Sequence, residues 1–434
     1  MKYYLIIVLF SICYANEIKT LPGLEFDLNF KHYSGYLNAS NNHRLHYWFA
    51  ESQNNVSSDP LIFWFNGGPG CSSLVGMLVE HGPFLLDEDG EKLRENNHSW
   101  NKVASVVYLE SPAGVGFSYS KNGDVLNNDD QTSQENYEAI KEFLQEFSQF
   151  RNHSIYLSGQ SYAGFYIPML ALRILNGQKA FPINFKGMAI GNGYMDINLN
   201  QITRVVYAYT HGFGDEETYR EFTNVCCQGN IETCEGSTLS LDCYRFFRNN
   251  SNKLIQTNGI DSYDINRICP YEENINPMRS HKMFRETPCF DEHENLRFYM
   301  NKKEVRDALH IPSHVQPWKI CAFDLDQTTY TTNYDDMKFF IKKVVEKGVK
   351  TLLYYGDSDL VCNFMLGQKF SSGLGLELLG SHEPWYFDEI VSGYYTSYAG
   401  LTFLTFRGAG HSVPVTHASQ MLYVLKTFLK NGKY

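Results

Sequence analysis

Four polar residues of this chain of 434 residues could assemble a site for nucleophilic catalysis. Ser161, Asp357, Asp359 and His411 each follow an apolar run that is typical of a buried strand. A serine hydroxyl becomes an effective nucleophile when a histidine accepts its proton and a carboxylate orients that histidine. The order Ser, Asp, His, with each residue at a strand end, lets them reach one edge of a sheet. The two aspartates compete for one role, and their spacing does not choose between them.

The residues around Ser161 indicate a sharp turn from a strand into a helix. Gly159 and Ala163 flank the serine two residues away on either side, close to the pattern G-x-S-x-G that raises a serine above an α/β sheet. Alanine replaces the second glycine and is small enough to fit. An ordinary strand–helix turn would explain this stretch on its own, so the prediction of a nucleophile depends on the rest of the chain.

A second glycine-rich turn could supply the donors that acyl transfer requires. Residues 61–65 form an apolar run that leads directly into Gly67-Gly68, where backbone N–H groups can face a ligand. We expect this turn and the N–H of Tyr162, directly after the serine, to stabilise a developing oxyanion.

The other elements predict an α/β-hydrolase fold with a mostly parallel central sheet. Strands are expected at residues 45–50, 61–65, 104–109, 185–190, 351–355 and 401–406. Helices are expected at residues 136–147, 165–172, 302–310 and 418–429. Strands that alternate with helices and end in short glycine-rich turns favour parallel pairing.

This alternation fades between residues 196 and 296, where the polar content rises and cysteines gather. We therefore predict an inserted cap subdomain, residues 196–296, stapled by disulfides. The hydrolase core would consist of a first part, residues 16–195, and a second part, residues 297–434.

The amino terminus and the composition indicate the secretory pathway. Residues 1–15 combine a lysine, a short apolar run and a small residue at Ala15, which is typical of a signal peptide and too short for a membrane span. No second apolar stretch reaches spanning length, so we expect no membrane association after its removal. The net charge of −11 disfavours nucleic acid as a partner. N-x-S/T sequons for glycosylation, which agree with secretion, lie at Asn38, Asn55, Asn97, Asn152 and Asn249.

The cysteines favour disulfides over a metal site. Of ten cysteines, Cys13 would leave with the signal peptide, and the odd number that remains requires at least one free thiol. The adjacent Cys226-Cys227, with Cys234 and Cys243, lack the paired C-x-x-C spacing of zinc sites. We predict no metal and no cofactor.

Four motifs in this order resemble the serine carboxypeptidase family: WFNGGPGCSS (64–73), GQSYAG (159–164), GDSDLVCNF (356–364) and RGAGHSVP (407–414). The segments ESPAGVGFSYS, GNGYMD and NKKEVRDALHIP agree as well, so the resemblance covers nearly the whole mature chain. The chain is similar in particular to the cathepsin A-like lysosomal members of the family.

The resemblance implies a role for each residue of the site. It implies Ser161 as nucleophile, Asp359 as the acid and His411 as the base. It implies an oxyanion hole formed by the N–H groups of Gly68 and Tyr162. It also implies recognition of the free C-terminal carboxylate of a peptide or protein by Asn66, Gly67, Glu80 and the residue before the serine. That last residue is a glutamate in the family and is Gln160 here, which is a departure from the family pattern.

The resemblance further implies a cysteine pairing: Cys71–Cys321, Cys226–Cys243, Cys227–Cys234 and Cys269–Cys289. It leaves Cys362 as the free thiol. The basic stretch at residues 277–285 lies inside the Cys269–Cys289 loop, and we predict activating cleavage there.

Other functions stay open at this point. Some relatives are acyltransferases that use a glucose ester in place of water, and the same three residues serve both reactions. Cathepsin A-like proteins also act as protective partners of lysosomal glycosidases. A lipase or esterase would leave the carboxylate-binding residues unexplained. A homodimer, and a lysosomal as against a secreted location, also stay open.

Overall fold

The computed structural model describes residues 16–232, 234, 239–254, 260–268, 294–322 and 329–434. The predicted signal peptide, the Cys269–Cys289 pair and the predicted cleavage stretch lie outside the described residues. No helix in the described ranges is long and apolar enough to cross a membrane.

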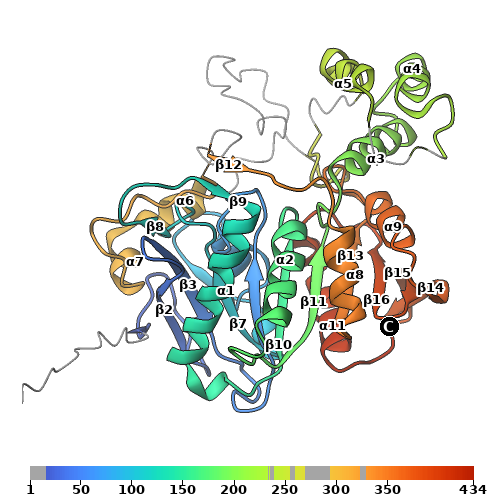
Figure 1. The fold of residues 1–434 in the computed structure, drawn as a ribbon. Coiled ribbons are helices and arrows are strands. Elements are labelled where there is room, and N and C mark those ends of the chain that lie inside the picture. Colours follow the sequence, from blue (N-terminus) through green and yellow to red (C-terminus); the bar gives the residue numbers. More distant parts are fainter. Residues whose placement is uncertain (1–15, 233, 235–238, 255–259, 269–293, 323–328) are drawn as a thin grey trace, which may run out of the picture.

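One large sheet forms the centre of the molecule (Figure 1). Its strand order is β1-β2-β3-β7-β4-β10-β11-β13-β16-β15-β14, with β8 paired to β3. The pairings from β7 to β16 are parallel, and the pairings on both sides of this centre are antiparallel. This arrangement confirms the α/β-hydrolase fold and its largely parallel central sheet.

The strands of this sheet are β1 (Asn16–Glu17), β2 (His32–Asn38), β3 (His43–Ala50), β4 (Leu61–Phe65), β7 (Ser105–Leu109), β8 (Tyr119–Ser120), β10 (Ile155–Gln160), β11 (Phe185–Gly191), β13 (Lys350–Gly356), β14 (Leu378–Phe387), β15 (Ile390–Tyr398) and β16 (Leu401–Phe406). Short pairs form outside it, from β5 (Phe84–Leu86), β6 (Leu93–Glu95), β9 (Asn127–Asn128) and β12 (Tyr330–Thr331). Strands β4 and β7 are buried throughout, as expected for strands covered on both faces.

Helices cover both faces of the sheet. One buried cluster contains apolar residues of α1 (Asp129–Glu146), α2 (Ala163–Asn176), α8 (Lys338–Glu346) and α9 (Phe364–Ser372). The other contains residues of α6 (Glu294–Asn301), α7 (Lys303–Ala308), α10 (Val413–Thr416) and α11 (Ala418–Leu429). The sheet therefore lies between two apolar layers, which leaves its strand ends free to carry polar loops.

The sequence located most of these elements but not all of their limits. The helix predicted from residue 136 begins at Asp129, because the side chain of Asn128 caps it by accepting the N–H of Gln131. The helix predicted over residues 302–310 is shorter. The antiparallel hairpin β14–β15 was not predicted, since its outward-facing residues give only a weak apolar pattern.

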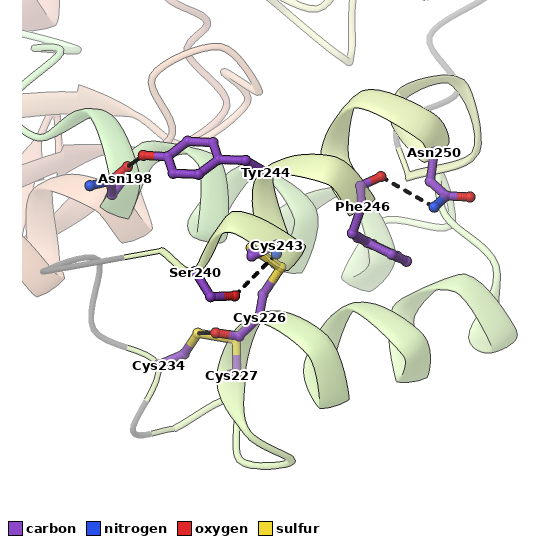
Figure 2. Close-up of a disulfide and its surroundings, with 9 residues drawn as sticks. All are labelled: Asn198, Cys226, Cys227, Cys234, Ser240, Cys243, Tyr244, Phe246 and Asn250. Atoms are coloured by element: carbon purple, nitrogen blue, oxygen red, sulfur yellow. Dashed lines mark hydrogen bonds between the residues drawn. A yellow bond between two sulfur atoms is a disulfide. The ribbon is translucent and has the colours of Figure 1, made fainter.

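The described part of the region between β11 and β12 contains helices joined by turns and irregular segments. Helices α3 (Ile197–Thr210), α4 (Glu216–Cys227) and α5 (Leu241–Leu254) lie together (Figure 1), and α3 packs against the start of α9. Two disulfides, Cys226–Cys243 and Cys227–Cys234, join the end of α4 to α5 and to the loop between them (Figure 2). The division into core and cap at residues 196–296 stays a prediction.

A third disulfide, Cys71–Cys321, ties the loop after β4 to the segment that follows α7. These bonds are three of the four pairs that the family resemblance implies, and Cys362 is a buried free thiol. The five sequon asparagines are exposed, which permits glycosylation. Their glycosylation stays a prediction. No group of side chains among the described residues could hold a metal ion.

Candidate active site

Ser161 lies at the turn between β10 and α2 with a backbone φ of 60°. Non-glycine residues rarely adopt this left-handed conformation, which is found where a structure must present a side chain. A Cβ added at Gly159 would lie 2.7 Å from the Cβ of Ala163. The alanine fits at this position because Gly159 has no side chain, so the change from G-x-S-x-G leaves the turn intact.

The turn after β4 approaches this serine very closely. A Cβ added at Gly67 would lie 2.5 Å from the backbone nitrogen of Tyr162 and 2.6 Å from the Cβ of Ser161. Gly68 has a φ of 116°, a backbone conformation that glycine adopts readily and other residues rarely adopt. The N–H groups of Gly68 and Tyr162 have no acceptor among the described residues. The two predicted oxyanion donors therefore lie beside the serine with their hydrogens available.

His411 is paired with Asp359. The imidazole Nδ1 lies 2.7 Å from Oδ2 of Asp359, and both side chains are buried. Because a carboxylate only accepts hydrogen bonds, Nδ1 carries the proton and Nε2 is the nitrogen that can accept another. The two residues follow β13 and β16, which are parallel neighbours in the sheet.

The neighbouring aspartate has a different position. Oδ1 of Asp357 accepts the N–H of Gly408 at 2.6 Å, in the loop that leads to His411. The geometry thus pairs Asp359 with the imidazole and Asp357 with the backbone of the histidine loop.

Two residues that the sequence analysis did not single out support this pair. The amide of Asn192, 0% exposed, donates from Nδ2 to Oδ2 of Asp359 at 2.9 Å and accepts the N–H of Gly356 at 2.9 Å. The carbonyl of Tyr263 accepts the N–H of His411 at 2.7 Å, and its ring packs edge-on against the imidazole at 4.9 Å. The motif GNG, placed directly after β11, is the sequence signal that could have identified Asn192.

The side chain of Tyr162 is also held by a residue distant in the sequence. Its hydroxyl donates to Oδ1 of Asp129 at 2.9 Å, the same oxygen that accepts the hydroxyl of Tyr330. The start of α1 and the segment at β12 are therefore joined to the residue that follows the nucleophile.

The predicted carboxylate-binding residues form a buried cluster. Oε1 of Glu80 accepts Nδ2 of Asn66 at 3.0 Å and Nε2 of Gln160 at 2.9 Å. Gln160 also donates to the hydroxyl of Ser412, next to His411, at 2.9 Å. Oε2 of Glu80 is buried and has no partner. Burial raises the pKa of Glu80 to about 7, against the opposing effects of Asn66, the charge of His411, Gln160 and Ser412.

Cys362 lies near Ser161, and its thiol is expected to be unreactive. Burial and then the charge of Asp359 raise the pKa of its thiol well above the usual value, while the charge of Arg204 and a hydrogen bond with Ser161 oppose the rise. A thiol held in this protonated form is a poor nucleophile.

Comparisons with known proteins show the family of the chain. The model of the serine carboxypeptidase family matches residues 22–431. The serine carboxypeptidase ctsa-4.1 of Caenorhabditis elegans is 37% identical over 460 residues, which cover 98% of this chain and 96% of the relative. The lysosomal protective protein of Mus musculus is 35% identical over 461 residues, covering 96% and 94%.

A solved structure has the same fold. The prohormone-processing carboxypeptidase Kex1ΔP from Saccharomyces cerevisiae superposes with a TM-score of 0.80 at 23% identity. The superposition covers 96% of this chain and 95% of that chain.

Proposed function

The chain belongs to the serine carboxypeptidase family, and we propose that it removes the C-terminal residue of peptides and proteins through an acyl-enzyme on Ser161. The observation that carries this proposal is the His411–Asp359 pair at the ends of two neighbouring parallel strands. It supports a base oriented toward the edge of the sheet where Ser161 lies in a strained turn.

The proposed reaction has two steps, acylation of Ser161 and hydrolysis of the acyl-enzyme. Ser161 Oγ attacks the carbonyl carbon of the last peptide bond while its proton passes to Nε2 of His411. The peptide C–N bond then breaks, the leaving amine takes that proton, and the terminal amino acid departs. Water attacks the acyl group in the second step, again giving a proton to His411, and Ser161 is restored with the second proton.

The oxyanion that forms in each step needs donors that are already in position. The N–H groups of Gly68 and Tyr162 fit this role because both are unbonded among the described residues and lie beside the serine. Donors fixed in advance stabilise developing charge without reorganisation.

Recognition of the free carboxylate is assigned to Asn66, Gly67, Glu80 and Gln160. A neutral Glu80 can donate from its unpartnered Oε2, and its pKa of about 7 keeps it neutral at acid pH. The site would then bind the substrate anion without a second negative charge. These carboxylate-binding residues favour a carboxypeptidase over an esterase. They do not distinguish hydrolysis from acyl transfer to another acceptor, and the test below does.

The test is C-terminal trimming of a peptide library, read by mass spectrometry, with wild type and Ser161→Ala. We expect wild type to shorten peptides by single residues and Ser161→Ala to lose on the order of a million-fold in turnover. The serine should also react with an organophosphate in wild type alone. Near-normal trimming by Ser161→Ala would overturn the assignment, and activity confined to acyl-glucose donors would make the protein an acyltransferase.

The family resemblance also supports entry into the secretory pathway, since a similar protein is a lysosomal protective protein and the disulfides require an oxidising compartment. We infer a lysosomal or secreted glycoprotein with peptide C-termini as substrates. Intracellular fractionation, with glycosidase treatment of the purified protein, tests both location and the use of the exposed sequons.

A further inference from the structure

Arg204 is a basic side chain that has no acidic partner among the described residues and lies on the helix that packs beside the proposed site. Arg204 is on α3 and is partly exposed, yet its Nε is buried and has no hydrogen-bond acceptor. Among the residues that the structure describes, no carboxylate forms an ion pair with it. A guanidinium that is partly desolvated and unpaired is costly unless a ligand compensates it.

The helix that carries Arg204 packs directly on the loop after β13. Thr203 accepts a hydrogen bond from Nδ2 of Asn363 at 3.3 Å, next to the free thiol. Tyr207 donates from its hydroxyl to the carbonyl of Asp357 at 2.6 Å. Since these neighbours anchor α3 on both sides of Arg204, the backbone of Arg204 has a defined place beside the loop that carries Asp357 and Asp359.

The charge of Arg204 is felt by groups that surround Ser161. Burial raises the pKa of Tyr194 and of Tyr263, and the positive charge of Arg204 opposes both shifts. Burial raises the pKa of the Cys362 thiol as well, and the charge of Arg204 opposes this rise too. The backbone N–H of Tyr194 donates to the carbonyl of Ser161 at 2.9 Å. Arg204 thus lies within electrostatic range of side chains from the segments next to Ser161 and Asp359.

Its location relative to the carboxylate-binding cluster identifies the part of the substrate that it would meet. In the proposed complex, the carboxylate of the substrate's last residue lies at Glu80 and Gln160. The charged side chain that acts on Glu80 there is His411. Arg204 instead reaches Tyr194 and Cys362. A peptide chain that crosses Ser161 therefore places its penultimate residue, whose carbonyl is attacked, on the side of Arg204.

We propose that Arg204 is a specificity-determining residue that binds an acidic side chain on the penultimate residue of the substrate. This inference rests on the proposed carboxypeptidase function and adds its substrate class. Arginine suits the task because its planar guanidinium always carries charge and bonds a carboxylate in a bidentate way. Glutamate and aspartate at this position would supply the acidic partner that Arg204 lacks among the described residues.

The experiment measures kcat/KM on N-blocked dipeptides that share a C-terminal leucine and carry Glu, Gln, Leu or Lys before it. At pH 5.5 the glutamate side chain is largely ionised, so Glu and Gln differ mainly in charge. We expect wild type to prefer Glu over Gln about tenfold. Arg204→Gln should reduce that ratio to about one by slowing the Glu substrate alone, and Arg204→Glu should shift the preference to Lys. Arg204→Lys should restore part of the preference.

The matched control is Arg220→Gln, which removes the same charge from the neighbouring helix α4, where the arginine is exposed and paired with Glu216. It should keep the wild-type Glu-to-Gln ratio. Titration with an organophosphate gives the concentration of folded active sites for every variant. An equal ratio in wild type and Arg204→Gln would overturn the inference while the carboxypeptidase function stands. A wild type that reacts with the organophosphate but cleaves none of the dipeptides would overturn the proposed function itself, and this inference with it.

Discussion

Asp359 and Glu80 both carry buried carboxyl groups near Ser161. They are 0% and 2% exposed, and yet their hydrogen-bond donors are arranged differently. Donors approach both oxygens of Asp359, from His411, from Asn192 and from the N–H groups that follow the aspartate. Both side-chain amides on Glu80 approach one oxygen, and the other oxygen has no partner.

This difference shows how hydrogen-bond donors, rather than burial, assign the work of a carboxyl group. Donors to both oxygens stabilise the ionised form, whereas burial with few donors favours the protonated form. Asp359 therefore accepts hydrogen bonds at both oxygens, which suits its proposed role of orienting His411. Glu80, with its pKa raised to about 7 by burial, retains a proton at acid pH and can donate it toward an anion.

The largest expected effect comes from breaking the acceptor. Asp359→Asn should lower kcat on a peptide about 10⁴-fold, because the amide can no longer hold His411 in the productive tautomer. Asp357→Asn should stay within about fivefold of wild type, since its amide oxygen can still accept the N–H of Gly408. Steady-state kinetics on both variants, normalised to folded protein by circular dichroism, decide the question. The reverse ranking would mean that Asp357 is the acid.

A smaller effect should follow when a donor to Asp359 is removed. Asn192→Gly keeps the positive φ of 38° and deletes the amide that reaches Asp359 and Gly356. We expect kcat to fall about 10²-fold with KM nearly unchanged, because the orientation of the base suffers and substrate binding does not. A matched rise in KM, or a fall in kcat that tracks a lower melting temperature alone, would place Asn192 outside this network.

The smallest effect concerns the proton on Glu80. Below pH 7 this carboxyl is neutral and above pH 7 it ionises and repels the substrate anion, so kcat/KM for peptides should fall by up to about tenfold as pH rises through 7. Gln160→Glu adds a second carboxyl against Glu80 and should steepen this fall, whereas Glu80→Gln should flatten it.

The control substrates are C-terminally amidated peptides, which lack the free carboxylate and should give nearly the same pH profile in all three proteins. The measurement is a pH series of kcat/KM for matched peptide and amide substrates. Superimposable peptide profiles for wild type and Gln160→Glu would show that Gln160 takes no part in carboxylate recognition.

Much of the proposed catalytic centre could be predicted from local patterns. The buried strands, the small residues around Ser161 and the chain order of serine, aspartate and histidine each depend on neighbours within a few positions. Such patterns encode how the chain turns, so they also predicted the parallel centre of the sheet. The family motifs then selected Asp359 over Asp357, a choice that spacing had left open.

Other features depended on contacts between distant parts of the chain. The family resemblance placed Glu80 and Gln160 in one site, but the hydrogen bond between these residues, 80 positions apart, is given only by the structure. The same holds for the pairing of Asn192 with Asp359, and for the carbonyl of Tyr263 against His411. The position of Arg204 on the side of the proposed site likewise depends on how α3 packs on the loop after β13.

The sequence by itself therefore determined which residues stand at strand ends, the sharp turn at Ser161 and, through its motifs, the family. The tertiary structure decided which polar groups meet and which oxygen stays without a partner. The physical reason is range: turns and strands are set by short-range sterics and apolar periodicity. Burial, hydrogen-bond pairing and the pKa of Glu80 are set by atoms that only folding brings together.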